Sequence, residues 1–271
     1  MPTSGPAALL GVPYDAASSF RRGPAAAPDH IRAALASPAG NSWSEMLVDI
    51  SAPSVLTDAG DVRLDEDDVR TAIENAVTRV MSTGVRPIIL GGDHSITFPV
   101  VRVVSRTVER LTILHIDAHA DLYDSFEGDR YSHACPFARI MEERLATRLV
   151  QVGIRTMTRH QREQADRFQV EVIDMRRWET GVRPRIGPSE TVYLSLDMDG
   201  IDPGFAPGVS HPEPGGLTVR EVVSLIHRLD APLVAADVVE CNPEVDPSGI
   251  TSYVAAKLVK EIAAAMHRVA R

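Results

Sequence analysis

Short runs of apolar, mostly β-branched residues recur from one end of the sequence to the other, and they limit the possible folds more than any other feature. The runs are too short for ordinary helices, and they lack the polar alternation of a strand that has one wet face. Both properties are typical of strands that are buried on two faces, as in parallel sheets. The predicted strands are Ala8–Val12, Leu47–Ile50, Pro87–Leu90, Leu111–Ile116, Leu149–Ile154, Val170–Ile173, Thr191–Leu196 and Leu233–Val239.

Segments with helical periodicity lie between these runs. Asp68–Met81 carries valine and isoleucine on one stripe that can pack on a sheet. Thr218 and Glu221 have the spacing of a capping box, which opens a helix that runs through Leu229, and Ser252–Val269 is the last predicted helix. Alternating strands and helices predict a three-layer α/β/α fold around a mostly parallel sheet of about eight strands.

The chain is expected to form one domain that spans residues 1–271, because no convincing linker interrupts the pattern. The stretch Asp202–Gly216 is rich in proline and glycine and resembles a linker in composition. It lies between a predicted strand and a capped helix, however, so a functional loop is the favoured interpretation.

The composition restricts the class of protein. With 44% hydrophobic and 24% charged residues, the chain is typical of soluble globular proteins. Its formal net charge of -9 argues against nucleic-acid binding and suits a small cationic substrate. No apolar stretch is long enough to span a membrane, and the amino terminus has no secretory signal pattern. Cys135 and Cys241 are far apart, so we expect no disulfide framework and a reducing cytoplasm as the location.

Acidic residues and histidines follow three of the predicted strands, at the point where each strand ends. The carboxyl ends of parallel strands line the ligand crevice of an open α/β sheet, so side chains that are distant in sequence can meet there. Alternate residues of an extended segment point to the same side, which lets each group share a face. These residues are His94 after Pro87–Leu90, Asp117, His119 and Asp121 after Leu111–Ile116, and Asp197 and Asp199 after Thr191–Leu196.

Such a cluster requires a cation, because crowded carboxylates raise one another's pKa and destabilise the fold. Ligation by oxygen and imidazole without thiolate suits manganese better than structural zinc, while zinc, cobalt and iron stay open. Taken alone, Asp197 with Asp199 is more often a solvated turn, and His94 is more often a hydrogen-bonded loop histidine. Their occurrence together at three strand ends predicts a dinuclear metal site.

The same residues resemble the metal motifs of the ureohydrolase family, which contains arginases and agmatinases. The matching segments are Gly91–His94, Asp117–Asp121 and Ser195–Pro203, in the family's order, with further similarity at Gly11–Asp15, Phe205–Gly208, Gly215–Thr218 and Asp237–Pro243. Within the family the chain is most similar to plant-type arginases, a group near the agmatinases. This likeness is carried by Ser18–Pro24, Tyr131–Ala134, Phe137–Met141, Gln151–Arg155 and Gly208–Gly216.

The resemblance implies an arginase-like fold and two Mn²⁺ per chain. One ion would be held by His94, Asp117, Asp121 and Asp197, and the other by His119, Asp117, Asp197 and Asp199. Asp117 and Asp197 would therefore bridge the two ions.

The expected reaction is the release of urea from a small guanidino compound. Guanidinium carbon is a poor electrophile, and a metal-bridging hydroxide supplies the strong nucleophile that it needs at neutral pH. Asp121 can take the proton of the attacking hydroxide, and His133, which resembles the family's catalytic histidine, can protonate the leaving amine. Glu240 follows the last predicted strand and can pair with the guanidinium. Without the resemblance, His133 reads as a loop histidine and Glu240 as a solvated residue or helix cap.

The substrate is not decided by the sequence. Asp124, Glu127 and Asp129 follow Asp121 in an acidic loop, and if they face the substrate's tail they favour agmatine, which yields putrescine. Asp129 is therefore grouped with His133 and Glu240 as substrate-binding. The likeness to plant-type arginases favours L-arginine, which yields ornithine. Guanidinobutyrate and other guanidino acids stay open.

Two other kinds of protein are weighed against this interpretation. A zinc deacetylase-like amidohydrolase shares a related fold, but that class generally uses one metal, and the doubled aspartate motifs disfavour it. A non-catalytic relative has no support, because every expected ligand, His133 and Glu240 are present. The resemblance also implies a homo-oligomer, either a trimer or a hexamer.

Overall fold

The computed structural model describes residues 6–64 and 68–268. Its strands are β1 (Ala7–Val12), β2 (Leu56–Asp61), β3 (Arg86–Gly91), β4 (Thr112–Ile116), β5 (Arg148–Val152), β6 (Glu171–Ile173), β7 (Val192–Asp197) and β8 (Leu233–Val239). They form one eight-stranded sheet in the order β2-β1-β3-β8-β7-β4-β5-β6, and every neighbouring pair is parallel. The predicted parallel sheet is therefore confirmed.

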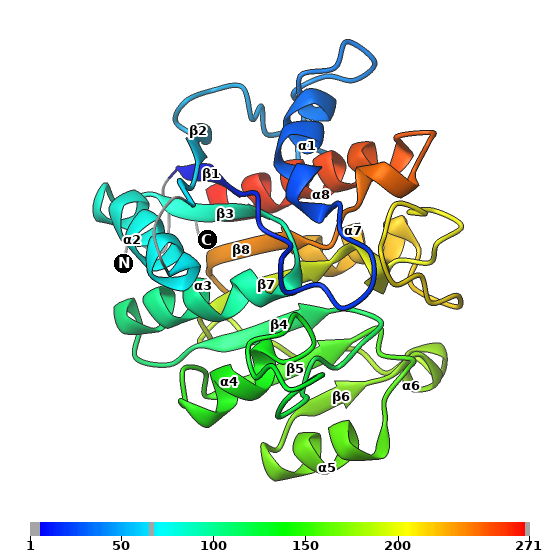
Figure 1. Ribbon diagram of the computed structural model, residues 1–271. Coiled ribbons are helices and arrows are strands. Elements are labelled where there is room, and N and C mark those ends of the chain that lie inside the picture. The colour runs from blue at the N-terminus through cyan, green and yellow to red at the C-terminus, as the bar shows by residue number, and fades with distance from the viewer. Residues whose placement is uncertain (1–5, 65–67, 269–271) are drawn as a thin grey trace.

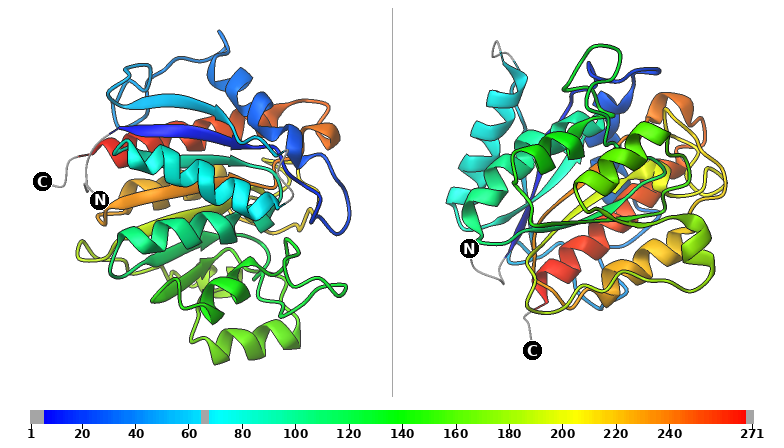
Figure 2. Two further views of the ribbon diagram at one scale, coloured as in Figure 1. Left: turned by 60° about the vertical axis from the view of Figure 1, so that its left-hand side comes forward. Right: turned by 90° about the horizontal axis from the view of Figure 1, so that it is seen from below.

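Helices cover both faces of this sheet, which gives the three predicted layers (Figure 1, Figure 2). They are α1 (Ala27–Leu35), α2 (Val69–Ser82), α3 (Thr97–Val104), α4 (Pro136–Glu142), α5 (Arg159–Arg167), α6 (Met175–Glu179), α7 (Val219–Arg228) and α8 (Ile250–His267). One hydrophobic core joins the sheet to α1, α6, α7 and α8, and a second joins its other face to α2, α3, α4 and α5. Within the described ranges, no helix has both the length and the apolar composition needed to cross a membrane.

The central strands are mainly apolar because each contributes to both cores. In β3, Ile88 and Leu90 lie in the core with α1 and α8, whereas Ile89 lies in the core with α2 and α3. Successive side chains of a strand point to opposite faces, so a strand covered on two sides favours apolar residues at successive positions. This explains the continuous apolar runs in the sequence.

The strand order brings together four strand ends that are distant in sequence. β3, β8, β7 and β4 are consecutive in the sheet, and their carboxyl ends lie at the same edge because all four are parallel. In the register, Ser195 of β7 lies opposite both His115 of β4 and Asp237 of β8. Residues that follow these strands are therefore neighbours in space.

The strand predicted at Leu47–Ile50 is wrong. This segment lies in a loop, where Leu47 has a φ of 58° and is 80% exposed. The strand at this edge of the sheet is instead β2, whose residues are mostly exposed and include Thr57, Asp58 and Asp61. Polar edge strands discourage further pairing with other chains, so β2 carries no apolar signal.

The predicted helices are confirmed, with shifted ends. The side chain of Asp68 caps α2, and Thr218 with Glu221 forms the predicted capping box of α7. The last helix begins at Ile250, after Gly249 in the left-handed conformation, so it starts two residues before the predicted Ser252. The predicted end at residue 269 lies outside the described residues.

Candidate metal centre and active site

The loop after β1 packs directly over the segment that carries His94. Gly92 is required at this crossing, because a Cβ atom there would lie 1.7 Å from the carbonyl oxygen of Tyr14. Asp93 then anchors the loop, since its Oδ2 accepts a 2.9 Å hydrogen bond from the backbone N–H of Ala17. Close packing and this hydrogen bond therefore hold the end of β3 and the loop after β1 together.

His94 faces three of the predicted carboxylates. Its Nδ1 lies 3.3 Å from Asp117 Oδ2, 3.0 Å from Asp121 Oδ2 and 3.1 Å from Asp197 Oδ2. The ring is fully buried, and this nitrogen has no well-aligned hydrogen-bond partner within the described part of the chain. A buried nitrogen and three carboxylate oxygens that converge in this way have the chemistry of a metal ligand set.

A second group lies around His119. Its Nδ1 is 3.0 Å from Asp199 Oδ2 and 3.5 Å from Asp117 Oδ1. Asp199 is held in place because its Oδ1 accepts a 3.1 Å hydrogen bond from Ala118 N, and its own N–H donates to Asp197 Oδ1 over 2.8 Å. This group can hold a second ion.

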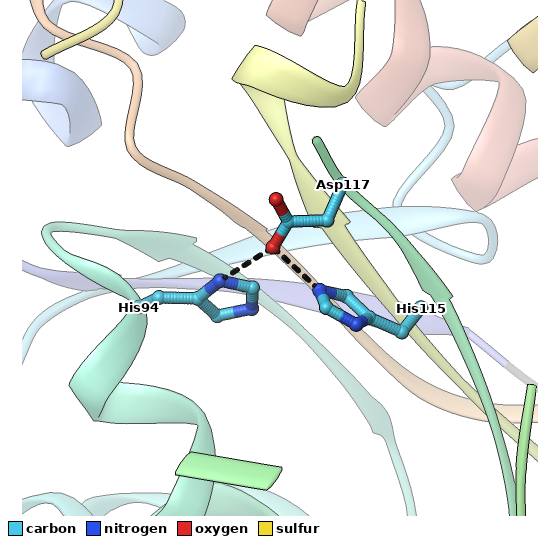
Figure 3. Close-up of side chains that lie close together, drawn as sticks. All are labelled: His94, His115 and Asp117. Carbon is cyan, nitrogen blue, oxygen red and sulfur yellow. Dashed lines mark hydrogen bonds and ion pairs between the residues drawn. The ribbon is translucent and has the colours of Figure 1, made fainter. Parts of the chain in front are cut away.

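Asp117 belongs to both groups. Its Oδ2 faces His94 and accepts a 2.7 Å hydrogen bond from His115 Nε2 (Figure 3). Its Oδ1 faces His119 and accepts a 2.5 Å hydrogen bond from that residue's backbone N–H. The two oxygens of one carboxylate therefore point to two different groups, which is the arrangement of a bridging ligand.

The electrostatics of the cluster favour positive charge at both ligand groups, the one around His94 and the one around His119. Burial, followed by the carboxylates of Asp199 and Asp117, raises the pKa of Asp197 well above its usual range. Burial also raises the pKa of Asp199 to about 6. Burial alone would lower the histidine values, but the facing carboxylates raise the pKa of His94 well above its usual range and that of His119 to about 12. These groups fit a pair of bound cations.

His133 and Glu240 form a buried pair beside the cluster. His133 Nδ1 lies 2.8 Å from Glu240 Oε1, which also accepts a 2.9 Å hydrogen bond from His94 N. Burial opposes charge on the ring, but Glu240 raises the pKa of His133 to about 9. The other oxygen, Oε2, has no hydrogen-bond partner within the described residues. Asp121 and Glu240 have φ angles of 49° and 61°, in the left-handed region that non-glycine residues seldom adopt.

A pocket of about 160 Å³ opens onto these groups. It brings together most of the predicted site residues and adds neutral polar and aromatic side chains around them. The lining residues are Ser19, His119, Asp121, Tyr123, Phe126, His133, Ala134, Thr156, Thr158, Gln161, Asp197, Asp199, His211 and Glu240. The fully buried His94 and Asp117 lie behind the lining.

The acidic side chains of Asp124, Glu127 and Asp129 do not line this pocket, although Tyr123 and Phe126 of the same loop do. Asp124 instead pairs with Arg130 at 3.0 Å and with Arg139 at 3.1 Å. Asp129 accepts a 2.7 Å hydrogen bond from Tyr131 N, and it does not line the pocket. The structure therefore does not bring Asp129 to the predicted substrate site.

Ser19 and His211 are site residues that the residue patterns did not single out. Ser19 Oγ lies 2.8 Å from His133 Nε2 and 3.4 Å from His211 Nε2, so it connects the two rings. Both residues come from loops, where neither strand position nor spacing indicates a role. The available signal was the family likeness of their segments and the functional interpretation of the Asp202–Gly216 loop.

Comparison with known proteins agrees with this geometry. Residues 6–265 match the model of the arginase family. The chain is 49% identical over 273 residues to the mitochondrial arginase 1 of Arabidopsis thaliana, covering 94% of this chain and 80% of that protein. It is 46% identical over 277 residues to the chloroplastic/mitochondrial arginase 2 of the same plant, covering 96% and 80%. The structure of an arginase from Medicago truncatula matches with a TM-score of 0.92 and 45% identity, covering 97% of this chain and 88% of that one.

The same comparison corrects the predicted location. The two Arabidopsis relatives are named as mitochondrial and as chloroplastic/mitochondrial, so the prediction of a cytoplasmic protein is wrong. The prediction rested on the scarcity of cysteine. A low cysteine count indicates that no disulfide framework is needed, and it does not distinguish one reducing compartment from another.

Proposed function

Since this chain belongs to the arginase family, we propose that it is a two-manganese hydrolase that releases urea from a guanidino substrate, with L-arginine as the first candidate. The observation that carries this proposal is the position of Asp117, whose two carboxylate oxygens face two separate ligand groups. Glu240 Oε2, which has no hydrogen-bond partner in the described ranges, lies beside these groups and can receive a guanidinium.

In this proposal the predicted ligands keep their assignments. His94, Asp117, Asp121 and Asp197 would hold one Mn²⁺, and His119, Asp117, Asp197 and Asp199 would hold the other. Carboxylate and imidazole ligands without thiolate suit manganese. When bound, the metal pair supplies Lewis acidity and a water of lowered pKa, which provides the nucleophile at neutral pH.

The protein's own groups then orient the substrate and move protons. Glu240 binds the guanidinium through its carboxylate, which both neutralises and orients it. Asp121 lines the pocket next to His94 and accepts the proton of the attacking water. His133 donates a proton to the leaving amine, and its contact with the carboxylate of Glu240 favours the charged ring.

L-Arginine is the favoured candidate over agmatine because, among the described residues, no further carboxylate lines the pocket. The acidic side chains of the lining are Asp121, Asp197, Asp199 and Glu240, and all are assigned to the metals or the guanidinium. The tail would therefore meet neutral residues such as Thr158 and Gln161, which can hydrogen-bond an amine or a carboxylate. The names of the two Arabidopsis relatives support the same choice.

The test is urea release by manganese-loaded protein from L-arginine, agmatine and guanidinobutyrate. We expect kcat/KM to be highest for L-arginine. A clear preference for agmatine or guanidinobutyrate would support the proposed reaction but refute L-arginine as the substrate. Absence of urea from every compound, in protein shown to contain two Mn²⁺, would refute the proposed function.

We also propose one domain and a homo-oligomer, a trimer or a hexamer, on the strength of the family resemblance. Light scattering after gel filtration measures the oligomer directly. A monomer at micromolar concentration would contradict this part of the proposal.

A further inference from the structure

We propose that Gln151 and His115 form a hydrogen-bonded relay that positions the carboxylate of Asp117 between the two candidate ligand groups. Figure 3 shows the last link of this relay, from His115 to Asp117. Both would be positioning residues, because they act through Asp117 and do not contact substrate. The inference rests on the proposed function only in assigning Asp117 as a bridging ligand.

The sheet register brings the relay together. His115 of β4 and Gln151 of β5 lie directly opposite each other in the parallel ladder, and both side chains are fully buried. Gln151 Nε2 lies 3.0 Å from His115 Nδ1, and His115 Nε2 lies 2.7 Å from Asp117 Oδ2. A continuous chain of polar contacts thus runs from β5 through β4 to the candidate metal centre.

The direction of each hydrogen bond follows from one fixed acceptor. Gln151 also contacts the carbonyl oxygen of Ala120 at 2.6 Å, and a carbonyl can only accept, so the contacting atom must be the amide nitrogen. The second N–H of that amide faces His115 Nδ1, which must then be the acceptor. The ring proton therefore lies on Nε2 and is donated to Asp117.

This donor explains why Asp117 can serve two ions. One hydrogen bond to Oδ2 from His115 and one to Oδ1 from His119 N fix the plane of the carboxylate. Each oxygen has a further lone pair, which remains for the group that the oxygen faces. The ring of His115 also packs against Phe137, with centroids 3.9 Å apart, so it has little freedom to turn away.

His115 is therefore not itself a metal ligand, although it lies close to two of them. The nitrogen and oxygen atoms of His94, His115 and Asp117 lie within 4.8 Å of one another, which could suggest a third ion site. Both ring nitrogens of His115 are already engaged, one as donor and one as acceptor. Hydrogen-bonded partners of this kind orient metal ligands, and their loss typically costs about 10–100-fold in metal affinity or activity.

The first test measures Mn²⁺ affinity by the electron paramagnetic resonance signal of free Mn²⁺. We expect Gln151→Leu and His115→Leu to bind Mn²⁺ about 10–100-fold more weakly than wild type. His115→Gln, which can still donate from a side-chain amide, should recover most of that affinity. Gln164→Leu is the matched control, because Gln164 is also buried but lies in α5 and bonds Arg167. Unchanged affinity in Gln151→Leu and His115→Leu would overturn the relay.

The second test reads the tautomer of His115 by ¹⁵N NMR of metal-free protein, and it does not depend on activity. Wild type should show a proton on Nε2, and Gln151→Leu should shift the ring toward a mixture of tautomers. A wild-type proton on Nδ1 would overturn the relay even if His115→Leu failed to fold. Wild-type protein that binds no Mn²⁺ would overturn the metal centre and the relay together, whereas two bound ions with unaltered variants would overturn the relay alone.

Discussion

His133 is the residue whose loss should separate catalysis from metal binding. Its Nδ1 lies 2.8 Å from Glu240 Oε1. It does not belong to the ligand group that His94 forms with three carboxylates. We expect His133→Asn to lower kcat by about 10²–10⁴-fold, which is the usual contribution of a general acid or base. Metal content measured by mass spectrometry should stay at the wild-type value. Wild-type turnover in this variant would mean that another group protonates the leaving amine.

The His133–Glu240 pair should also make the stability of metal-free protein depend on pH. Burial alone would lower the pKa of His133, but Glu240 raises it to about 9, above the ordinary value of 6.5. The pair therefore stabilises the fold fully below about pH 6.5, and this contribution is lost as the pH rises through about 9. NMR titration of the metal-free protein should show the high pKa in wild type and a lower one in Glu240→Gln. Equal His133 pKa values in the two proteins would show that Glu240 does not stabilise the charged ring of His133.

At the scale of elements, the crossing of the β1 loop over the β3 end should be the most sensitive junction. Gly92→Ala would force a methyl group into the backbone of Tyr14, so the loop, His94 and the Gly92 carbonyl that accepts from Glu240 N must all shift. We expect a loss of stability of at least about 1–3 kcal/mol and weaker Mn²⁺ binding. Chemical denaturation and metal titration measure the two effects.

Gly187→Ala is the control for this junction. A Cβ atom at Gly187 meets no neighbour within 4 Å, so the same change should alter stability and metal affinity little. If both variants behave alike, the close packing at Gly92 is not what holds the site together.

Across the whole molecule, metal binding should control stability. Ligands that bind only the folded state stabilise it by about 2.7 kcal/mol per site at a hundredfold excess over Kd. We therefore expect the melting temperature to fall on chelation, to recover with Mn²⁺, and to depend on Mn²⁺ concentration. Asp197→Ala should lose both ions or nearly both and show little such response. One tightly bound zinc in active wild-type protein would contradict the dinuclear manganese centre.

The sequence by itself determined the class of fold and the residue types of the site. Apolar runs predicted seven of the strands because a strand buried on both faces is mainly apolar. The runs did not predict β2, because an exposed edge strand need not be apolar. The motifs at the strand ends predicted the metal ligands, which remain predictions, because residue types at strand ends limit the chemistry available there. Only the tertiary structure decided which of these ends are neighbours.

The strand order β3-β8-β7-β4 is set by packing between distant parts of the chain, and no local pattern encodes it. The pairing of β5 with β4 puts Gln151 behind His115, and loops bring Ser19 and His211 to the pocket. Ion pairs with Arg130 and Arg139 keep Asp124 occupied, and a hydrogen bond from Tyr131 N holds Asp129. The prediction from the sequence considered only the charge of the acidic loop. A carboxylate can bind a substrate only if its own hydrogen bonds and ion pairs allow it to face the pocket. That direction depends on side-chain contacts, which only the folded chain supplies.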